Sequence, residues 1–228
     1  MRYIEIDFLR GMAIIFMVIF HFFYDLQIFK FLDINIYHSF FWIHFRDLII
    51  FLFMITVGIS LSLSNEKAFN LKKNLIRLAK LLAVSLLITA VSYFIYPKYW
   101  IYFGIIHLIF TASILALPFV KLPRTALFIG VSILIIYFTL SINMNWLYNI
   151  LKEILHLPQY TKDIAHLFPW LGVVFIGIFI GHKRYFLLNL KTNIMTKNIA
   201  FLGQHALLIY LIHQPIMMGI IGGIKKFL

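Results

Sequence analysis

Apolar segments of membrane-spanning length follow one another along nearly all of this 228-residue chain, and this constrains its fold more than any other feature. A helix needs about 20 consecutive apolar residues to cross the hydrocarbon core of a bilayer. The pattern therefore predicts an all-α, polytopic integral membrane bundle of about seven transmembrane helices, forming a single domain over residues 1–228. The predicted helices lie near 8–29, 47–64, 75–96, 101–119, 123–141, 167–181 and 199–222, and the sixth is short.

Composition agrees with a multi-pass protein of the cell membrane. The chain is 63% hydrophobic and 12% charged, whereas a soluble domain is nearer half apolar and a quarter charged. The absence of cysteine excludes disulfides, thiolate metal sites and cysteine nucleophiles. We expect the net charge of +12 to reflect membrane topology and contact with lipid, not nucleic acid.

The distribution of positive charge predicts the orientation of the helices. With the N-terminus inside, thirteen of the 20 lysines and arginines fall on the inner side. Cytoplasmic connections carry the excess of lysine and arginine in membrane proteins. We therefore expect the N-terminus inside and the C-terminus outside.

The first apolar segment carries a polar stripe. At 100° per residue, Arg10 and His21 lie about 20° apart around the helix axis and about 16 Å apart along it. Asp7, Tyr24 and Asp25 fall within the same arc of about 100°. A charge in hydrocarbon costs several kcal/mol, so this stripe is expected to face protein or a water-filled cavity. We interpret it as the wall of a functional site.

Later segments add polar groups at membrane depth or at its border. His107 either faces the same cavity or is a hydrogen-bonded core histidine. Asp163 and His166 precede a proline at the start of the sixth predicted helix, which suggests a rim for a substrate. In the seventh, Pro215 leaves a carbonyl free one turn back, with His213 and Gln214 beside it.

Five segments of the chain resemble the catalytic domain of heparan-α-glucosaminide N-acetyltransferases and their small prokaryotic relatives. They cover most of the chain in order and read EIDFLRGMAIIFMVIFHF, FLFMITVGISLSLS, YFGIIHLI, DIAHLFPWLGVVFIGIFIG and FLGQHALLIYLIHQP. The ten-residue interval between Arg10 and His21 is also similar to that of acyltransferase-3 enzymes, which belong to the same transmembrane acyltransferase superfamily.

The resemblance implies transfer of an acetyl or other acyl group from acyl-coenzyme A, entering from the cytoplasm, to an amine or hydroxyl beyond the membrane. The acceptor would be a glycan or a small molecule. Arg10 and His21 match the acyltransferase-3 motif, whereas the glucosaminide branch places its important histidine in the following loop. There His38 is the nearer match and His44 a rival, and the sequence leaves the three histidines open.

Acyl transfer from a thioester needs a base or a nucleophile, and neutral imidazole can be either near pH 7. Asp25 or Asp47 could orient such an imidazole, although Asp47 could equally pair with Arg46 at the surface. Coenzyme A phosphates need cations. For these we expect Arg10 in the first place, together with Lys72, Lys73 and Arg77, although membrane topology alone is the simpler explanation of the last three.

Other classes of function remain alternatives. Intramembrane Asp, Arg and His also form proton relays, so a transporter of protons or small solutes is the main rival. A metal carrier is not expected, because no two histidines lie three or four residues apart. A scaffold subunit is also compatible with the pattern, and the oligomeric state, a homodimer included, is open.

Overall fold

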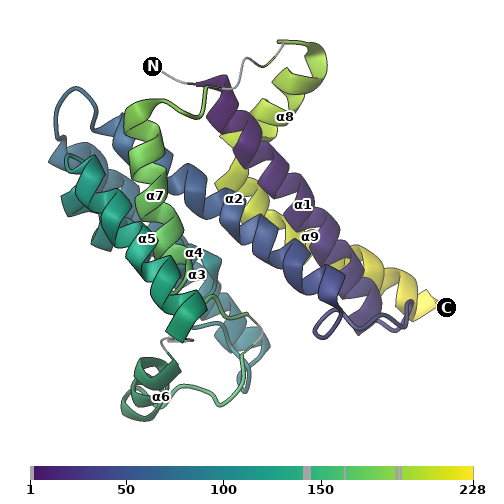
Figure 1. The fold of residues 1–228 in the computed structure, drawn as a ribbon. Coiled ribbons are helices and arrows are strands. Elements are labelled where there is room, and N and C mark those ends of the chain that lie inside the picture. The colour runs from purple at the N-terminus through teal and green to yellow at the C-terminus, as the bar shows by residue number, and fades with distance from the viewer. Residues whose placement is uncertain (1–2, 141–144, 162, 188–189, 191, 228) are drawn as a thin grey trace. The chain divides into compact units, whose positions relative to one another are not determined.

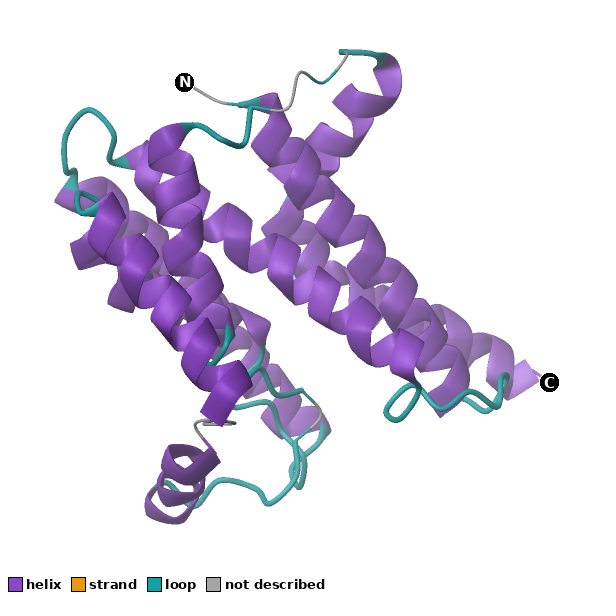
Figure 2. Cartoon of the chain, viewed as in Figure 1, coloured by secondary structure: helices purple, strands orange, loops and turns teal. Residues whose placement is uncertain are grey.

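The computed structural model describes residues 3–140, 145–161, 163–187, 190 and 192–227, with the backbone alone for residues 145–148. The chain is 76% helix, and no strand is formed among these residues (Figures 1 and 2). The predicted all-α class is confirmed. The helices are α1 (Ile4–Ile28), α2 (Phe40–Ser64), α3 (Leu71–Ile95), α4 (Ile105–Ala116), the 3₁₀ turn η1 (Leu117–Phe119), α5 (Pro123–Leu140), α6 (Asn145–Ile154), α7 (Trp170–Lys183), α8 (Ile194–Gln204) and α9 (Ala206–Phe227).

Five of these helices are long and apolar enough to cross a membrane, namely α1, α2, α3, α5 and α9. Two shorter apolar helices accompany them, one formed by α4 with η1 and the other by α7. The chain is therefore a multi-pass membrane helical protein. That all seven cross, and that the N-terminus lies inside, stay predictions.

Local signals explain where several helices begin. The side chains of Asn70 and Asn193 accept hydrogen bonds from the backbone N–H groups of Lys73 and Thr196, at 2.9 and 2.8 Å, and so cap α3 and α8. Pro123 is the first residue of α5, a position where the missing N–H costs nothing.

The helix predicted at 199–222 is divided in the structure. Its first part belongs to α8, which ends at Gln204, and α9 begins at Ala206. Between them, His205 leaves the helical conformation with φ −105° and ψ 18°. The apolar pattern runs through this break, because both helices bury apolar residues and hydropathy does not register a change in backbone direction.

The chain forms two compact units, which are described separately. The first comprises residues 1–56 and 186–228. In it, α1 packs along α8 and α9. Gly11 of α1 meets the backbone carbonyl of Ile199, and Gly203 of α8 meets that of Asp7, so closely that a Cβ atom at either glycine would collide. These two glycines allow the helix backbones to touch.

The second unit comprises residues 57–185, in which α3 packs on α4 and α5 packs on α7. Gly130 and Gly172 allow a close approach of α5 and α7. A Cβ atom at either one would lie within 2.9 Å of the other's carbonyl oxygen. Leu108 of α4 and Val174 and Ile178 of α7 are fully buried in its core.

Candidate active site

Two residues of the polar stripe on α1, Asp7 and Asp25, are buried within the first unit. Asp25 is fully buried and Asp7 nearly so. Arg10 donates from Nη1 to Asp7 Oδ1 at 3.1 Å, one turn away on the same helix. The positive charge of Arg10 therefore compensates the negative charge of the buried Asp7 carboxylate.

The second contribution to the site comes from α9. His213 is 8% exposed, and its Nδ1 lies 2.7 Å from the backbone carbonyl oxygen of Tyr210. A carbonyl can only accept, so Nδ1 of His213 carries the proton. In the neutral ring, Nε2 then holds the lone pair. That nitrogen is buried and has no hydrogen-bond partner among the described residues.

His213 and Gln214 meet the stripe of α1. Gln214 Nε2 donates to Asp25 Oδ1 at 2.7 Å, and the rings of His213 and His21 lie edge to face with centroids 4.9 Å apart. We call these four residues, His21, Asp25, His213 and Gln214, the α1–α9 cluster. The structure thus brings together site residues that were predicted on the first apolar segment, His21 and Asp25, and on the seventh, His213 and Gln214.

The α1–α9 cluster has unused hydrogen-bonding capacity. Each of its members has one buried polar atom without a partner in the described part of the chain: His21 Nδ1, Asp25 Oδ2, His213 Nε2 and Gln214 Oε1. Leaving a buried donor or acceptor unsatisfied costs about 1–3 kcal/mol. Four such atoms in one place are the expected signature of a site that a substrate or water completes.

Tyr24 extends the cluster toward the connection between α1 and α2. Its ring lies 6.0 Å from that of His21, and its hydroxyl accepts a hydrogen bond from Tyr37 at 3.1 Å. His38 follows Tyr37 and is exposed, and its backbone N–H donates a hydrogen bond to Asn35 Oδ1. The loop that the family resemblance singles out is therefore tied to α1 one residue before His38.

His44 and Asp47 lie on the first turns of α2, where His44 is exposed and Asp47 is half-buried. Nδ1 of His44 donates to the carbonyl of Phe40 at 2.8 Å, and the two rings lie 4.0 Å apart. Asp47 pairs with Arg46 at 3.7 Å, the surface ion pair that the sequence left open. Neither residue has a described contact with the α1–α9 cluster.

The remaining predicted residues lie in the second unit. Nδ1 of His107 accepts from the backbone N–H of Gly104 at 3.3 Å, and its Nε2 lies 2.9 Å from the hydroxyl of Thr89, which itself donates to a carbonyl. Both ring nitrogens are thus used within the fold. Asp163 is half-buried against Gly104, and His166 is exposed.

The cations predicted to bind coenzyme A phosphates lie on the first two turns of α3. Lys72 and Lys73 are exposed and Arg77 is half-buried. Beside them, Asn65 and Asn74 exchange two hydrogen bonds between their buried side-chain amides, at 2.8 and 3.2 Å. This pair holds the start of α3 against the end of α2.

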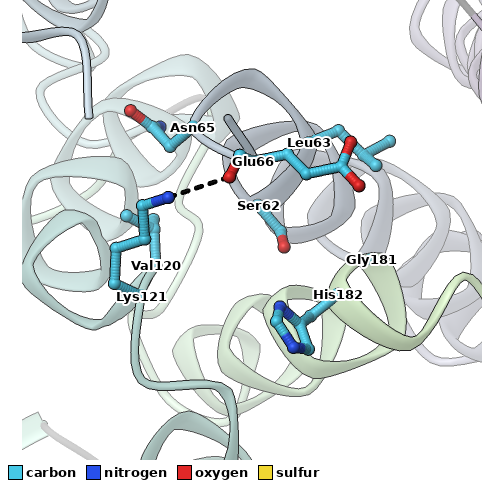
Figure 3. A pocket seen from close by; sticks show the side chains of 8 residues that line it. All are labelled: Ser62, Leu63, Asn65, Glu66, Val120, Lys121, Gly181 and His182. Carbon is cyan, nitrogen blue, oxygen red and sulfur yellow. Dashed lines mark hydrogen bonds between the residues drawn. The ribbon is translucent and has the colours of Figure 1, made fainter. Parts of the chain in front are cut away.

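A small polar pocket of about 110 Å³ lies near the end of α2 (Figure 3). Lys121 donates to the backbone carbonyl of Glu66 at 2.9 Å, and Arg184 donates to the Glu66 carboxylate at 2.7 Å. The bond from Arg184 lowers the pKa of Glu66 below its ordinary value. These cations cap the carboxyl end of α2. The lining residues are Ser62, Leu63, Asn65, Glu66, Val120, Lys121, Gly181 and His182.

The comparison with known families decides the class of the chain. The family model for the heparan-alpha-glucosaminide N-acetyltransferase catalytic domain matches residues 2–215. The chain belongs to this family. No curated protein and no solved structure matches it.

Membership of the heparan-alpha-glucosaminide N-acetyltransferase catalytic family implies a membrane enzyme of acetyltransferase type, and acetyl-CoA is the donor of the family in general. Among the described residues, no group of three or more His, Cys, Asp or Glu side chains could hold a metal ion.

The structure also shows groups that sequence reasoning did not single out. The carbonyl of Tyr210 sets the tautomer of His213, and Tyr37 reaches Tyr24. Gln27 has a buried side-chain oxygen without a partner in the described region. Of these residues, only Gln27 could have been recognised in the sequence, since it is a polar residue near the end of an apolar helix.

Proposed function

We propose that the chain transfers an acetyl group from cytoplasmic acetyl-CoA to an amine or hydroxyl of an acceptor beyond the membrane, with a glycan as the acceptor class, and that transfer takes place at the α1–α9 cluster. The observation that carries this proposal is the buried, unpartnered Nε2 of His213 beside His21, Asp25 and Gln214. A neutral imidazole nitrogen with its lone pair free is the group that removes a proton from an acceptor.

The step follows from the tautomer of His213. Nε2 takes the proton of the acceptor while the acceptor's oxygen or nitrogen attacks the thioester carbonyl. The imidazolium that forms is stabilised at Nδ1–H by the Tyr210 carbonyl, 2.7 Å away. The bond between the carbonyl carbon and sulfur then breaks, and the coenzyme A sulfur leaves with the proton that Nε2 had taken from the acceptor. Attack by an imidazole to form an acyl-histidine is the other route, and His21 is the candidate nucleophile for it.

Asp25 and Gln214 are the polar residues of the cluster that accompany the proposed base, His213. Gln214 holds one carboxylate oxygen of Asp25, and the other oxygen remains available to the acceptor or to an imidazolium. In the first unit, Arg10 is proposed to guide the donor. The residues of the second unit are separate proposals: Asp163 and His166 for acceptor binding, and Lys72, Lys73 and Arg77 for the phosphates of the donor.

His38, His44 and Asp47 keep the roles that the family resemblance implies as rival proposals. His44 has the same tautomer as His213, since its Nδ1 donates to a carbonyl of its own helix. It differs in being exposed. Burial against the ring of His21 favours His213, because hydrogen bonds and charges act more strongly where water is excluded.

The donor half of the proposal is tested by calorimetric titration of acetyl-CoA into the purified protein in detergent. We expect binding, and we expect Arg10→Lys to weaken it by about 10- to 100-fold, since losing one charge-assisted hydrogen bond costs roughly 1.5–3 kcal/mol. Arg10→Lys keeps a cation for Asp7, so the buried carboxylate stays paired. Absence of binding to folded wild-type protein would contradict the proposal.

A proton or solute transporter is the second candidate, favoured by the four unpartnered polar atoms on α1 and α9. Such groups in membrane helices also form relays. Ion flux into vesicles that contain the protein, in the absence of acetyl-CoA, would support this function over acyl transfer.

A further inference from the structure

Helix α6 is short and separates apolar from polar side chains. Ile150, Ile154 and Leu155 are 46%, 67% and 58% exposed. Leu155 directly follows the last residue of α6, and its N–H still donates to the carbonyl of Leu151 at 3.0 Å. At 100° per residue, these three residues fall with Leu151 in an arc of about 140°, and Asn149 and Glu153 lie on the opposite side of the helix. Among the described residues, α6 belongs to none of the helix pairs that pack extensively, which agrees with the exposure of these apolar side chains.

The start of α6 is held near the end of a membrane span. Helix α5, one of the five helices able to cross a membrane, ends at Leu140, and α6 begins at Asn145. Five residue steps reach at most about 18 Å, even when the chain is fully extended. The first turn of α6 therefore lies close to the membrane surface at which α5 ends.

The segment after α6 is held at the same boundary. Thr161 donates from its hydroxyl to the carbonyl of Trp100 at 2.9 Å, and Ala165 N–H donates to Phe103 at 2.9 Å. Trp100 and Phe103 belong to the connection between α3 and α4. The ring of Trp100 lies 6.0 Å from Tyr93 and 5.6 Å from Tyr102. Clustered Trp and Tyr mark the interface between membrane and water.

The polar face of α6 indicates what its apolar face meets. Lys152 and Glu153 balance each other in charge, and Lys152 Nζ is held by the carbonyl of Gln159 at 2.9 Å. The helix therefore presents no net charge to a charged macromolecule. An amphipathic helix fixed at both ends to a bilayer surface is expected to lie in the plane of that surface.

We propose that α6 is an interfacial helix whose apolar face, Ile150, Leu151 and Ile154, continued by Leu155 just after the helix, binds phospholipid at the boundary of headgroups and acyl chains. The occupant is the bilayer itself, on the side that the charge distribution predicts to be outer. This inference is independent of acyl transfer. It places the segment of Asp163 and His166 next to the lipid surface, because that segment follows α6.

The chain contains no cysteine, so single-cysteine variants can be labelled without altering other positions. Nitroxide labels at Ile150→Cys and Ile154→Cys report the apolar face, and labels at Asn149→Cys and Glu153→Cys are the matched controls on neighbouring positions of the same helix. Each variant is placed in phosphatidylcholine vesicles. The collision rates of the label with oxygen and with a water-soluble nickel chelate are then measured by electron paramagnetic resonance.

We expect the apolar-face labels to collide more with oxygen than with nickel, at a depth of about 5–10 Å below the headgroups, and the control labels to show the reverse. Equal exposure of all four labels to nickel would overturn the proposal, because α6 would then lie in water. Shielding of the apolar-face labels from both reagents would also overturn it, since another protein surface, such as a second copy of the chain, would cover the face.

Discussion

The side-chain amide of Gln214 donates a 2.7 Å hydrogen bond to the carboxylate of Asp25, joining α9 to α1 across 189 residues of sequence. Asp25 is fully buried, so this bond acts where water cannot replace it. The residue before Gln214 is His213, whose ring meets that of His21. The bond therefore fixes the register in which the two histidines face each other.

Removing the carboxylate of Asp25 should destabilise the protein. Asp25→Ala leaves the Gln214 amide buried without its acceptor, at an expected cost of about 1–3 kcal/mol. Asp25→Asn keeps an oxygen that can accept the same bond and should unfold close to wild type. Thermal unfolding in detergent measures both variants, and equal midpoints for Asp25→Ala and wild type would contradict this account.

His107 should support the fold and take no part in acyl transfer. Both of its ring nitrogens are bonded, to Gly104 and to Thr89. His107→Ala leaves the backbone N–H of Gly104 without its acceptor, so we expect a lower unfolding temperature, corresponding to a loss of about 1–3 kcal/mol. The acetyl-transfer rate per folded molecule should stay unchanged at a temperature where the variant is folded. A large loss of that rate with unchanged stability would assign His107 to the site.

The contact of α1 with α8 should not tolerate a side chain at Gly203. A Cβ atom there meets the carbonyl of Asp7, which is backbone and cannot rotate away. We expect Gly203→Ala to destabilise the protein by about 1–3 kcal/mol or more.

Gly219 of α9 is the matched control, since nothing lies within 4 Å of the Cβ position there. Gly219→Ala should be neutral or stabilising by up to about 1 kcal/mol, because alanine favours helix more than glycine does. If both alanine variants unfold at the wild-type temperature, the close approach of α1 and α8 is not real.

The ion pair of Glu66 and Arg184 should make stability depend on acid pH. The hydrogen bond from Arg184 lowers the pKa of the Glu66 carboxyl in the folded chain below its ordinary value of 4.5. A carboxyl whose pKa is lowered by folding stabilises the fold fully above its unfolded pKa, and this contribution is lost as the pH falls through the lowered value.

Replacing Glu66 by glutamine should abolish this contribution. The difference in unfolding temperature between wild type and Glu66→Gln is expected to be largest above pH 4.5 and to shrink below it. Glu153→Gln, at an exposed position on α6 outside this ion pair, is the control. A difference that stays constant as the pH falls would show that the pair does not form.

Much of this architecture could be predicted from the sequence, because hydropathy depends only on local composition. The seven apolar helices and the stripe of Asp7, Arg10, His21 and Asp25 follow from periodicity along single helices. The match of residues 2–215 to the family confirms the resemblance that five short segments indicated.

Other features could not be predicted, because they depend on contacts between distant residues. The partner of Asp25 lies on α9, and no pattern within either helix encodes their register. Whether Nε2 of His107 is bonded depends on Thr89, 18 residues earlier. Helix α6 escaped prediction because ten residues of mixed polarity are too few for a search based on apolar length.

The assignment of acyl transfer to the α1–α9 cluster is tested most directly by measuring acetyl transfer in vesicles that contain wild type, His213→Gln or His205→Gln. Labelled acetyl-CoA is the donor, glucosamine and a neutral hexose oligosaccharide are the acceptor probes, and release of coenzyme A is followed in parallel. His205, which follows the last residue of α8, also donates its Nδ1 proton to a backbone carbonyl, that of Phe201, but is exposed, so it is the matched control. We predict that His213→Gln lowers the rate by about 10²–10⁴ while His205→Gln leaves it unchanged. Wild-type transfer by folded His213→Gln would contradict the assignment of the α1–α9 cluster as the site of acyl transfer.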